Sequence, residues 1–257
     1  MKRGKAFCAA IAALLAFASS ADAAEWKTVR LAAEFVYPPF NYIKDGQYAG
    51  FDVDIAKALC EHMKVQCVWV SQDWDGIIPG LLANKYDAIL SSMSITDARK
   101  KIIDFTQKYY NTPAHFMAQK GSGISDISPA ALKGKTIAVQ SSTNQLAFLE
   151  AYYKDSDIRT YQTTDDGAAD LAVGRVDLAF SDKVLFNEWL KTPAANGCCE
   201  LVGPDINDPS TLGTGKGVAL RKENADLRDM FDKAITEILA DGTYKAINDK
   251  YFNFSIY

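Results

Sequence analysis

Two separate stretches of this chain alternate strand-like and helix-like segments in the same order. Short apolar runs predict the strands, and longer segments with helical periodicity predict the helices. The expected elements of the first stretch are residues 29–33, 52–63, 67–71, 74–83 and 88–92, and those of the second are residues 136–140, 144–153, 158–162, 165–173 and 178–181. Each βαβαβ order predicts a mainly parallel sheet with flanking helices, so we expect an α/β protein of two lobes.

A shorter pattern occurs once in each stretch, just before and through the third strand. In the first stretch, Asp87 follows a basic residue by two positions and precedes a short apolar strand that ends in Ser91. In the second, Asp177 and Ser181 stand in the same relation. The two lobes are therefore expected to share local structure as well as topology.

Residues 1–23 have the composition of a secretory signal peptide. Three basic residues precede an alanine-rich apolar run at residues 9–18, and the small residues Ala21 and Ala23 place cleavage after Ala23. The apolar run is too short to be a permanent membrane anchor. We therefore expect a mature protein that is exported.

Charge and composition narrow the class of partner. The chain has a formal net charge of −4, which argues against nucleic acid as a partner. Its 257 residues are 48% hydrophobic and 23% charged, as expected of a globular protein with a sizeable core.

Four cysteines remain after the expected cleavage. Cys60 and Cys67 are close enough to join the end of a helix to the start of the next strand, and two unrelated buried thiols are the alternative. Cys198 and Cys199 are adjacent, which leaves free thiols or a vicinal disulfide open. No metal site is expected, because neither of the two histidines keeps ligand spacing with these cysteines.

The segment DAILSSMSITDAR, residues 87–99, carries the strongest signal for a ligand. A short buried strand opens into serines, Thr96 and Asp97 are expected to cap a helix, and Arg99 falls in its first turn. A cation there opposes the helix dipole, whereas a bound anion would meet both the free N–H groups and the guanidinium. The alternative is a capped turn whose arginine points into solvent.

Ligands of open α/β sheets bind beyond the carboxyl ends of the strands, so we expect the site in the cleft between the lobes. The residues just past the strand ends are Glu34 with Tyr37, Trp74, residues 91–99, residues 140–145 and Asp182. They offer an arginine for a carboxylate, an aspartate for an ammonium group, two aromatic faces and a further carboxylate. In the alternative interpretation Glu34 is a solvated acid, and Tyr37 and Trp74 belong to the core.

Several motifs in order give the chain a family resemblance. The segments VYPPFNYIKDGQYAGFDVDIAKALC, DWDGIIPGLLANKYDAILSSMSITDARKK, residues 139–145 and DGTYKAINDKYF resemble periplasmic solute-binding proteins of polar amino acid ABC importers. The likeness is to the lysine/arginine/ornithine and histidine receptor type, and it covers essentially the whole mature chain.

This resemblance implies a two-lobe periplasmic-binding-protein fold that closes about two hinge strands. The first lobe would comprise residues 26–111 and 215–257, the second residues 115–206, and the hinge residues 111–115 and 207–215. It also implies a disulfide between Cys60 and Cys67.

The resemblance further assigns a role to each expected ligand-binding residue. The arginine takes the ligand carboxylate with help from Ser94 and Thr143, and the aspartate takes the α-ammonium group with help from Ser92. The two aromatic residues sandwich the ligand side chain, and the remaining residues meet its far end. The full expected set is Glu34, Tyr37, Trp74, Ser91, Ser92, Ser94, Arg99, Gln140, Thr143 and Asp182.

Three positions depart from the pattern. Glu34 and Trp74 stand where relatives of this type carry aspartate and phenylalanine, and Ser142 stands where the family commonly has glycine. An ionised Glu34 facing the ligand side chain would be left unpaired by a neutral ligand, at a cost of roughly 1 to 3 kcal/mol. We therefore predict arginine, lysine, ornithine or histidine as the ligand.

The expected protein is a monomeric periplasmic receptor that delivers this amino acid to the membrane permease subunits of an ABC importer, without a cofactor. The alternatives are an exported dehydratase-like enzyme on the same fold, or a receptor for a neutral polar amino acid or an opine. No GxSxG motif occurs, and GTGKG at residues 213–217 fails the phosphate-loop pattern. His62 is expected to be structural, and His115 falls in the expected hinge.

Overall fold

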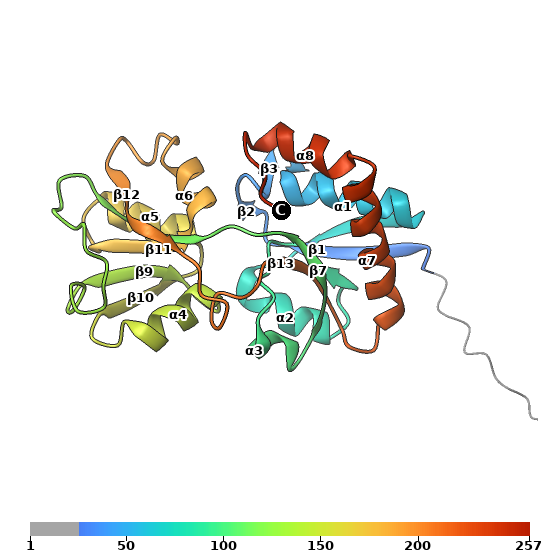
Figure 1. The fold of residues 1–257 in the computed structure, drawn as a ribbon, viewed down its shortest axis with the longest axis horizontal. Helices are drawn as coiled ribbons and strands as arrows, with labels where there is room; N and C mark the ends of the chain where they lie inside the picture. The colour runs from blue at the N-terminus through green and yellow to red at the C-terminus, as the bar shows by residue number, and fades with distance from the viewer. Residues whose placement is uncertain (1–25) are drawn as a thin grey trace, which may run out of the picture.

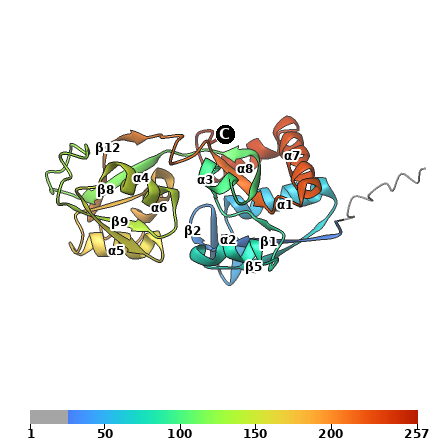
Figure 2. The same ribbon diagram turned by 90° about the horizontal axis from the view of Figure 1, so that it is seen from below.

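The computed structural model describes residues 26–257, which form two lobes, each built on its own five-stranded sheet (Figure 1). The expected signal peptide, residues 1–23, lies outside the described residues. Figures 1 and 2 show the two lobes lying next to each other along the long axis of the molecule. The predicted α/β, two-lobe architecture is confirmed.

The first lobe contains both ends of the described chain. Its elements are β1 (Thr28–Ala33), β2 (Val36–Tyr37), β3 (Asn41–Lys44), β4 (Gln47–Ala49), α1 (Phe51–Met63), β5 (Gln66–Ser71), α2 (Trp74–Leu82), β6 (Ala88–Ile89), α3 (Asp97–Lys100), β7 (Asp104–Tyr110), β13 (Lys216–Leu220), α7 (Ala225–Ala240) and α8 (Thr243–Tyr251). The main sheet has the order β5-β1-β6-β13-β7. As predicted, β1 pairs in parallel with β5 and β6, whereas β13 runs antiparallel to β6 and β7. The antiparallel sheet β2-β3-β4 was not predicted.

The second lobe repeats this plan. Its elements are β8 (Ala114–Gln119), β9 (Thr136–Gln140), α4 (Asn144–Tyr152), β10 (Asp157–Tyr161), α5 (Thr164–Ala172), β11 (Leu178–Asp182), α6 (Lys183–Trp189) and β12 (Cys199–Ile206). The sheet has the order β10-β9-β11-β8-β12. β9 pairs in parallel with β10 and β11, and β8 runs antiparallel to β11 and β12. Each sheet therefore has one reversed strand among five.

The C-terminal segment returns to the first lobe after the second lobe is complete. The chain leaves the first sheet between β7 and β8 and comes back between β12 and β13. Helix α7 has an apolar stripe that is buried against α1 and the sheet, with Leu227, Phe231, Ile235 and Ile238 fully covered. Hydrophobic burial of this stripe holds the C-terminal helices on the lobe that the N-terminal residues began.

The repeated aspartates occupy matching places in the two sheets. The Asp87 carboxylate accepts a hydrogen bond from the backbone N–H of Arg30 at 2.8 Å, and that of Asp177 accepts one from Thr136 at 2.9 Å. In both cases the aspartate precedes the third strand and bonds to the first strand of its unit. The short pattern in the sequence thus corresponds to a shared structural feature.

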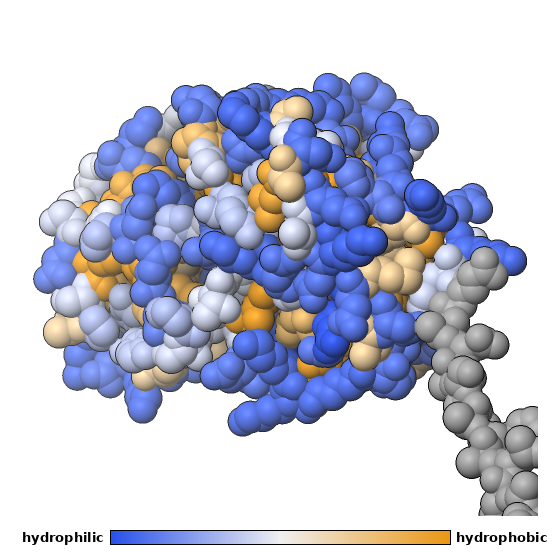
Figure 3. Space-filling view, turned by 45° about the vertical axis from the view of Figure 1, so that its right-hand side comes forward, coloured by the Kyte–Doolittle hydropathy of each residue, from blue (hydrophilic) through white to orange (hydrophobic). Residues whose placement is uncertain are grey.

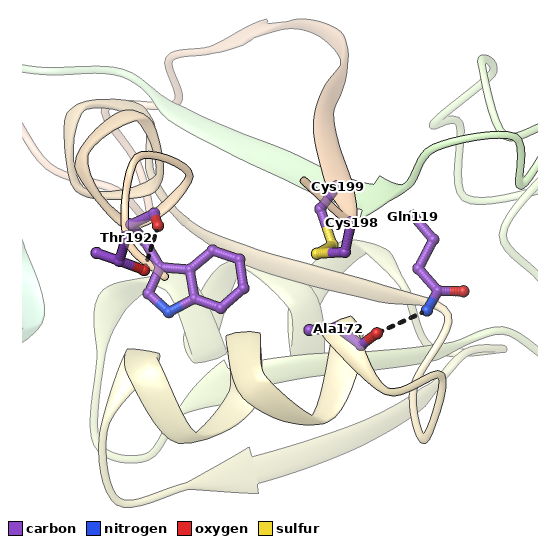
Figure 4. Close-up of a disulfide and its surroundings, with 6 residues drawn as sticks. Gln119, Ala172, Thr192, Cys198 and Cys199 are labelled. Carbon is purple, nitrogen blue, oxygen red and sulfur yellow. Dashed lines mark hydrogen bonds between the residues drawn. A yellow bond between two sulfur atoms is a disulfide. The ribbon is translucent and has the colours of Figure 1, made fainter. Parts of the chain in front are cut away.

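All four described cysteines are oxidised. Cys60 and Cys67 form the predicted disulfide between the end of α1 and the start of β5, with Cα atoms 6.1 Å apart. Cys198 and Cys199 form a vicinal disulfide at the start of β12 (Figure 4), which resolves the alternatives that the sequence left open. Near it, the Gln119 amide donates to the Ala172 carbonyl at 3.1 Å.

The surface of the described protein is polar over the face shown in Figure 3, where apolar side chains occur in small groups. Among residues 26–257, no helix combines the length and apolar character that crossing a bilayer requires.

Candidate functional site

A small cavity lies between the two lobes. Seven of the ten residues expected at the site line it, namely Glu34, Tyr37, Trp74, Ser91, Ser92, Gln140 and Thr143. The wall also includes Asn144, Gln145, Phe180, Ser181 and Lys216. Ser94, Arg99 and Asp182 do not line this cavity but bond to, or lie against, residues of its wall.

The serines of the first lobe follow β6, which is shorter than expected. The strand ends at Ile89, and the backbone turns at Ser92, whose φ of 54° lies in the left-handed region. The Ser92 hydroxyl donates to the buried carboxylate of Asp52 at 2.8 Å, and Asn41 and Tyr109 donate to the same carboxylate. Burial raises the pKa of Asp52 to about 6. Asp52 therefore fixes Ser92 in a strained turn at the cavity wall.

Arg99 is held by a short helix and by its own lobe. Thr96 caps α3 as predicted, because its hydroxyl accepts a hydrogen bond from the Arg99 N–H at 3.2 Å. One guanidinium nitrogen donates to the carbonyl of Ser94 at 3.0 Å, and the side chain is 8% exposed. The alternative of an arginine in solvent is therefore wrong.

The buried guanidinium of Arg99 has no carboxylate partner. No described Asp or Glu oxygen lies within ion-pair distance, and burial lowers the pKa of Arg99 to about 10. A buried cation without a counter-ion is costly, and an anion placed beside it would be bound strongly.

Within residues 26–257, Glu34 is an acidic side chain that lacks a cationic partner, just as Arg99 lacks a carboxylate partner. Its carboxylate accepts one side-chain hydrogen bond, from the Gln140 amide across the cleft at 3.0 Å, and has no cationic partner among the described residues. Burial raises the pKa of Glu34 to about 7, with smaller contributions from nearby aspartates that include Asp73. A cation near this carboxylate would restore its ionised form.

Asp182 ends β11 and is 1% exposed. Its carboxylate accepts hydrogen bonds from the hydroxyl groups of Thr112 and, at 3.1 Å, Tyr37. The ammonium group of Lys216 donates to Asp182 at 2.9 Å and to the Ser94 hydroxyl at 2.9 Å. Asp182 was expected to be open to a ligand, but a cation of the protein already pairs with it.

Sequence reasoning missed Lys216, which appeared only as part of a motif that failed the phosphate-loop test. The signal that could have revealed it is its place at the start of the apolar strand KGVAL. A lysine in a strand that is buried at every position must find a polar partner inside the protein.

The second-lobe wall starts at the end of β9. Thr143 caps α4 by accepting from the Leu146 N–H at 3.1 Å, and its hydroxyl donates to the carbonyl of Gln140. Ser142 has a φ of 57°, in the left-handed region that glycine adopts most easily. This conformation gives a physical reason for the glycine that the family commonly has at the position.

Hydrogen-bonded pairs of residues cross the cleft between the two lobes. The Trp74 indole N–H donates to the carbonyl of Ser142 at 3.2 Å, and the Ser141 hydroxyl donates to Asp75 at 2.8 Å. Gln140 with Glu34, and Tyr37 with Asp182, add two more such pairs. The cavity is consequently bounded by both lobes at once.

Neither histidine lines the cavity. His62 lies against Glu237 and Asp241 of the C-terminal region, and His115 contacts the carbonyl of Phe116 and, at 3.5 Å, Asp205. Over residues 26–257, no three His, Cys, Asp or Glu side chains gather as they would to hold a metal ion.

Comparisons with known proteins agree on the type of protein. The sequence profile of bacterial extracellular solute-binding proteins, family 3, matches residues 29–254. The L-arginine-binding protein of Pseudomonas aeruginosa is 46% identical over 235 residues, which cover 90% of each chain. The lysine/arginine/ornithine-binding periplasmic protein of Escherichia coli is 40% identical over 95% of this chain and 94% of its own.

A solved structure gives the same result for the fold. An ancestral arginine-binding protein bound to arginine superposes with a TM-score of 0.81 at 31% identity. The match covers 88% of this chain and 98% of that one.

Proposed function

Since this chain belongs to family 3 of the bacterial extracellular solute-binding proteins, we propose that it is a periplasmic receptor for a cationic amino acid. The receptor binds arginine, lysine, ornithine or histidine between its lobes and delivers it to the membrane subunits of an ABC importer. Relatives named for arginine and for lysine, arginine and ornithine support this choice of ligand class.

The observation that carries the proposal is a pair of unmet charges. Arg99 is a buried cation without a carboxylate, and Glu34 is a half-buried carboxyl group without a cation. A molecule with a carboxylate at one end and a cation at the other would pair with both. Charge-assisted hydrogen bonds contribute about 1.5 to 3 kcal/mol each, so two such pairings could supply most of a micromolar affinity.

The other expected residues complete the proposed site. Tyr37 and Trp74 bracket the aliphatic part of the ligand, and Ser91 and Gln140 lie on the cavity wall beside Glu34. Thr143 on the cavity wall and Ser94 beside it lie toward the carboxylate end. At the ammonium end, where Ser92 was expected to assist Asp182, the aspartate pairs with Lys216. Opening of the cleft uses the two connections between the lobes, residues 111–115 and 207–215.

The test is to identify the bound molecule and then measure affinities. Mass spectrometry of the protein after purification identifies what it retains. Calorimetry against the twenty amino acids and ornithine is then expected to give affinities in the micromolar range or tighter for cationic ligands only. Equal binding of glutamine and arginine would contradict the proposed ligand class.

We propose that the protein acts as a receptor and not as an enzyme. The relatives in the comparisons are binding proteins, and both histidines lie away from the cavity wall. A general acid or base would have to be one of the carboxyl groups, which the ligand's own charges are expected to pair. Incubation with the retained ligand should leave it unchanged, and its consumption would favour the dehydratase-like alternative.

A further inference from the structure

We infer that Lys216 occupies the subsite at Asp182 in which a ligand's α-ammonium group would otherwise bind, and so determines how much that group contributes to affinity. The inference rests on the proposed function and adds that the α-amino group of the ligand contributes little to affinity. With Lys216 in place, the cleft selects a carboxylate and a distal cation, and the α-amino group is dispensable.

The contacts of Lys216 are those expected of a bound ammonium group. The amine is 2.9 Å from a carboxylate oxygen of Asp182 and 2.9 Å from the Ser94 hydroxyl, and the residue is 5% exposed. Asp182 itself already accepts from Thr112 and Tyr37. The carboxylate of Asp182 therefore accepts from three side chains of the protein itself.

The cavities show that Lys216 stands between Asp182 and the cleft. Asp182 lines a second cavity, on the hinge side, but it does not line the cavity that holds Glu34 and Trp74. Lys216 lines both cavities. A ligand in the cleft thus meets the lysine before it meets the aspartate.

The charges that remain define the ligand. Among the charged side chains at the site, Lys216 and Asp182 pair with each other. Arg99 and Glu34 are left without counter-ions, and they match the two ends of an ω-guanidino or ω-amino carboxylate. An additional α-ammonium group could reach Asp182 only by displacing Lys216, which would break one ion pair to form another of the same kind.

The experiment compares L-arginine with 5-guanidinopentanoate, the same molecule without its α-amino group. Calorimetry on the wild-type protein is expected to give affinities within about tenfold of each other. In Lys216→Met and Lys216→Gln the aspartate lacks its resident cation, and an unpaired buried carboxylate is strongly unfavourable. Both variants are expected to prefer arginine by about 100-fold or more.

Lys222→Met is the matched control, because Lys222 lies six residues further along, is exposed and donates to the carbonyl of Lys101 away from the cavity. This control variant should keep the wild-type ratio of the affinities for L-arginine and 5-guanidinopentanoate. Lys216→Gln retains an amide donor toward Asp182, so it replaces the methionine variant in the experiment if that variant does not fold. The ratio of the two affinities in the wild-type protein tests the inference even without a variant.

The results separate this inference from the proposed function. A wild-type preference for arginine of about 100-fold or more, or a ratio that stays the same in both Lys216 variants, would overturn the role of Lys216 while leaving a cationic amino acid receptor intact. Failure of wild-type protein to bind either guanidino compound, with binding of a neutral amino acid, would overturn the proposed function itself.

Discussion

The guanidinium carbon of Arg99 lies 5.4 Å from the centre of the Trp74 ring, so the expected carboxylate-binding cation rests on an aromatic face. The same indole donates its N–H to the carbonyl of Ser142 in the other lobe. Trp74 therefore joins the cation of the first lobe to the wall of the second. A cation over an aromatic ring gains about 0.5 to 2 kcal/mol, depending on how far it is desolvated.

Replacement of Arg99 by methionine should abolish the binding of every amino acid. The variant removes a buried cation that has no other counter-ion, and affinity should fall at least about 100-fold. Calorimetry measures the loss, and Lys100→Met, at an exposed neighbouring position, should bind normally. Unchanged affinity in the Arg99 variant would remove this residue from the site.

Replacement of Glu34 by glutamine should change selectivity rather than binding as such. The variant keeps the shape of the side chain but removes the charge that faces the ligand cation. The affinity for arginine should therefore fall roughly 5- to 100-fold. The affinity for glutamine, the neutral comparison ligand, should change by less than about threefold, because glutamine has no side-chain cation to pair with Glu34. Equal losses for both ligands would contradict a selecting role for Glu34.

Binding of a cationic ligand should strengthen as the pH rises from about 5 to 7. Because the pKa of Glu34 is raised to about 7, the carboxyl group is mostly protonated below that pH in the free protein. A ligand cation favours the ionised form, so binding releases a proton, and affinity rises by up to about tenfold per pH unit before levelling off above pH 7.

Calorimetry at pH 6 in two buffers of different ionisation enthalpy measures this proton release directly. Nearly one proton per ligand is expected, and Glu34→Gln should release close to none. An affinity that falls with rising pH over this range would contradict the assignment of the titrating group.

Replacement of Trp74 by phenylalanine should weaken closure while leaving an aromatic face for Arg99. The variant loses the indole N–H that donates to Ser142 at 3.2 Å, so ligand dissociation should accelerate several-fold with little change in association. Stopped-flow fluorescence with a competing ligand measures both rates. An unchanged dissociation rate would show that this hydrogen bond does not hold the lobes together.

Removal of the Cys60–Cys67 disulfide should destabilise the protein, since the bond closes a loop with a sequence separation of 7. The loop-entropy account gives about 2 to 3 kcal/mol for the paired serine variant, or roughly 5 to 10 °C in Tm. The Cys198–Cys199 bond closes no loop between distant residues, so the corresponding variant should lose much less. Equal falls in Tm for the two double variants would contradict this account.

The predicted elements and the observed ones agree wherever the signal is local. The periodicity of α1, the parallel order of each βαβαβ unit and the cap of α3 at Thr96 all depend on residues within a few positions of each other. The small sheet β2-β3-β4 was missed because its strands are only two to four residues long, too short to show a period.

The candidate site was only partly predictable. Seven expected residues line the cavity, and most of them lie at or just past the end of a strand, a position that the order of elements predicts. The pairing of Lys216 with Asp182 joins residues 34 positions apart, and no pattern along the chain connects them. The same holds for Trp74 and Arg99, which meet through packing rather than through a shared helix.

The sequence by itself determined the two α/β units, the helix cap at Thr96 and most residues at their strand ends, because hydrophobic period and capping act over a few residues. Only the tertiary structure decided which charges pair and which stay free, because ion pairs between distant segments depend on how the lobes pack. In this protein that packing gives Asp182 a resident lysine and leaves Arg99 and Glu34 without counter-ions among the described residues.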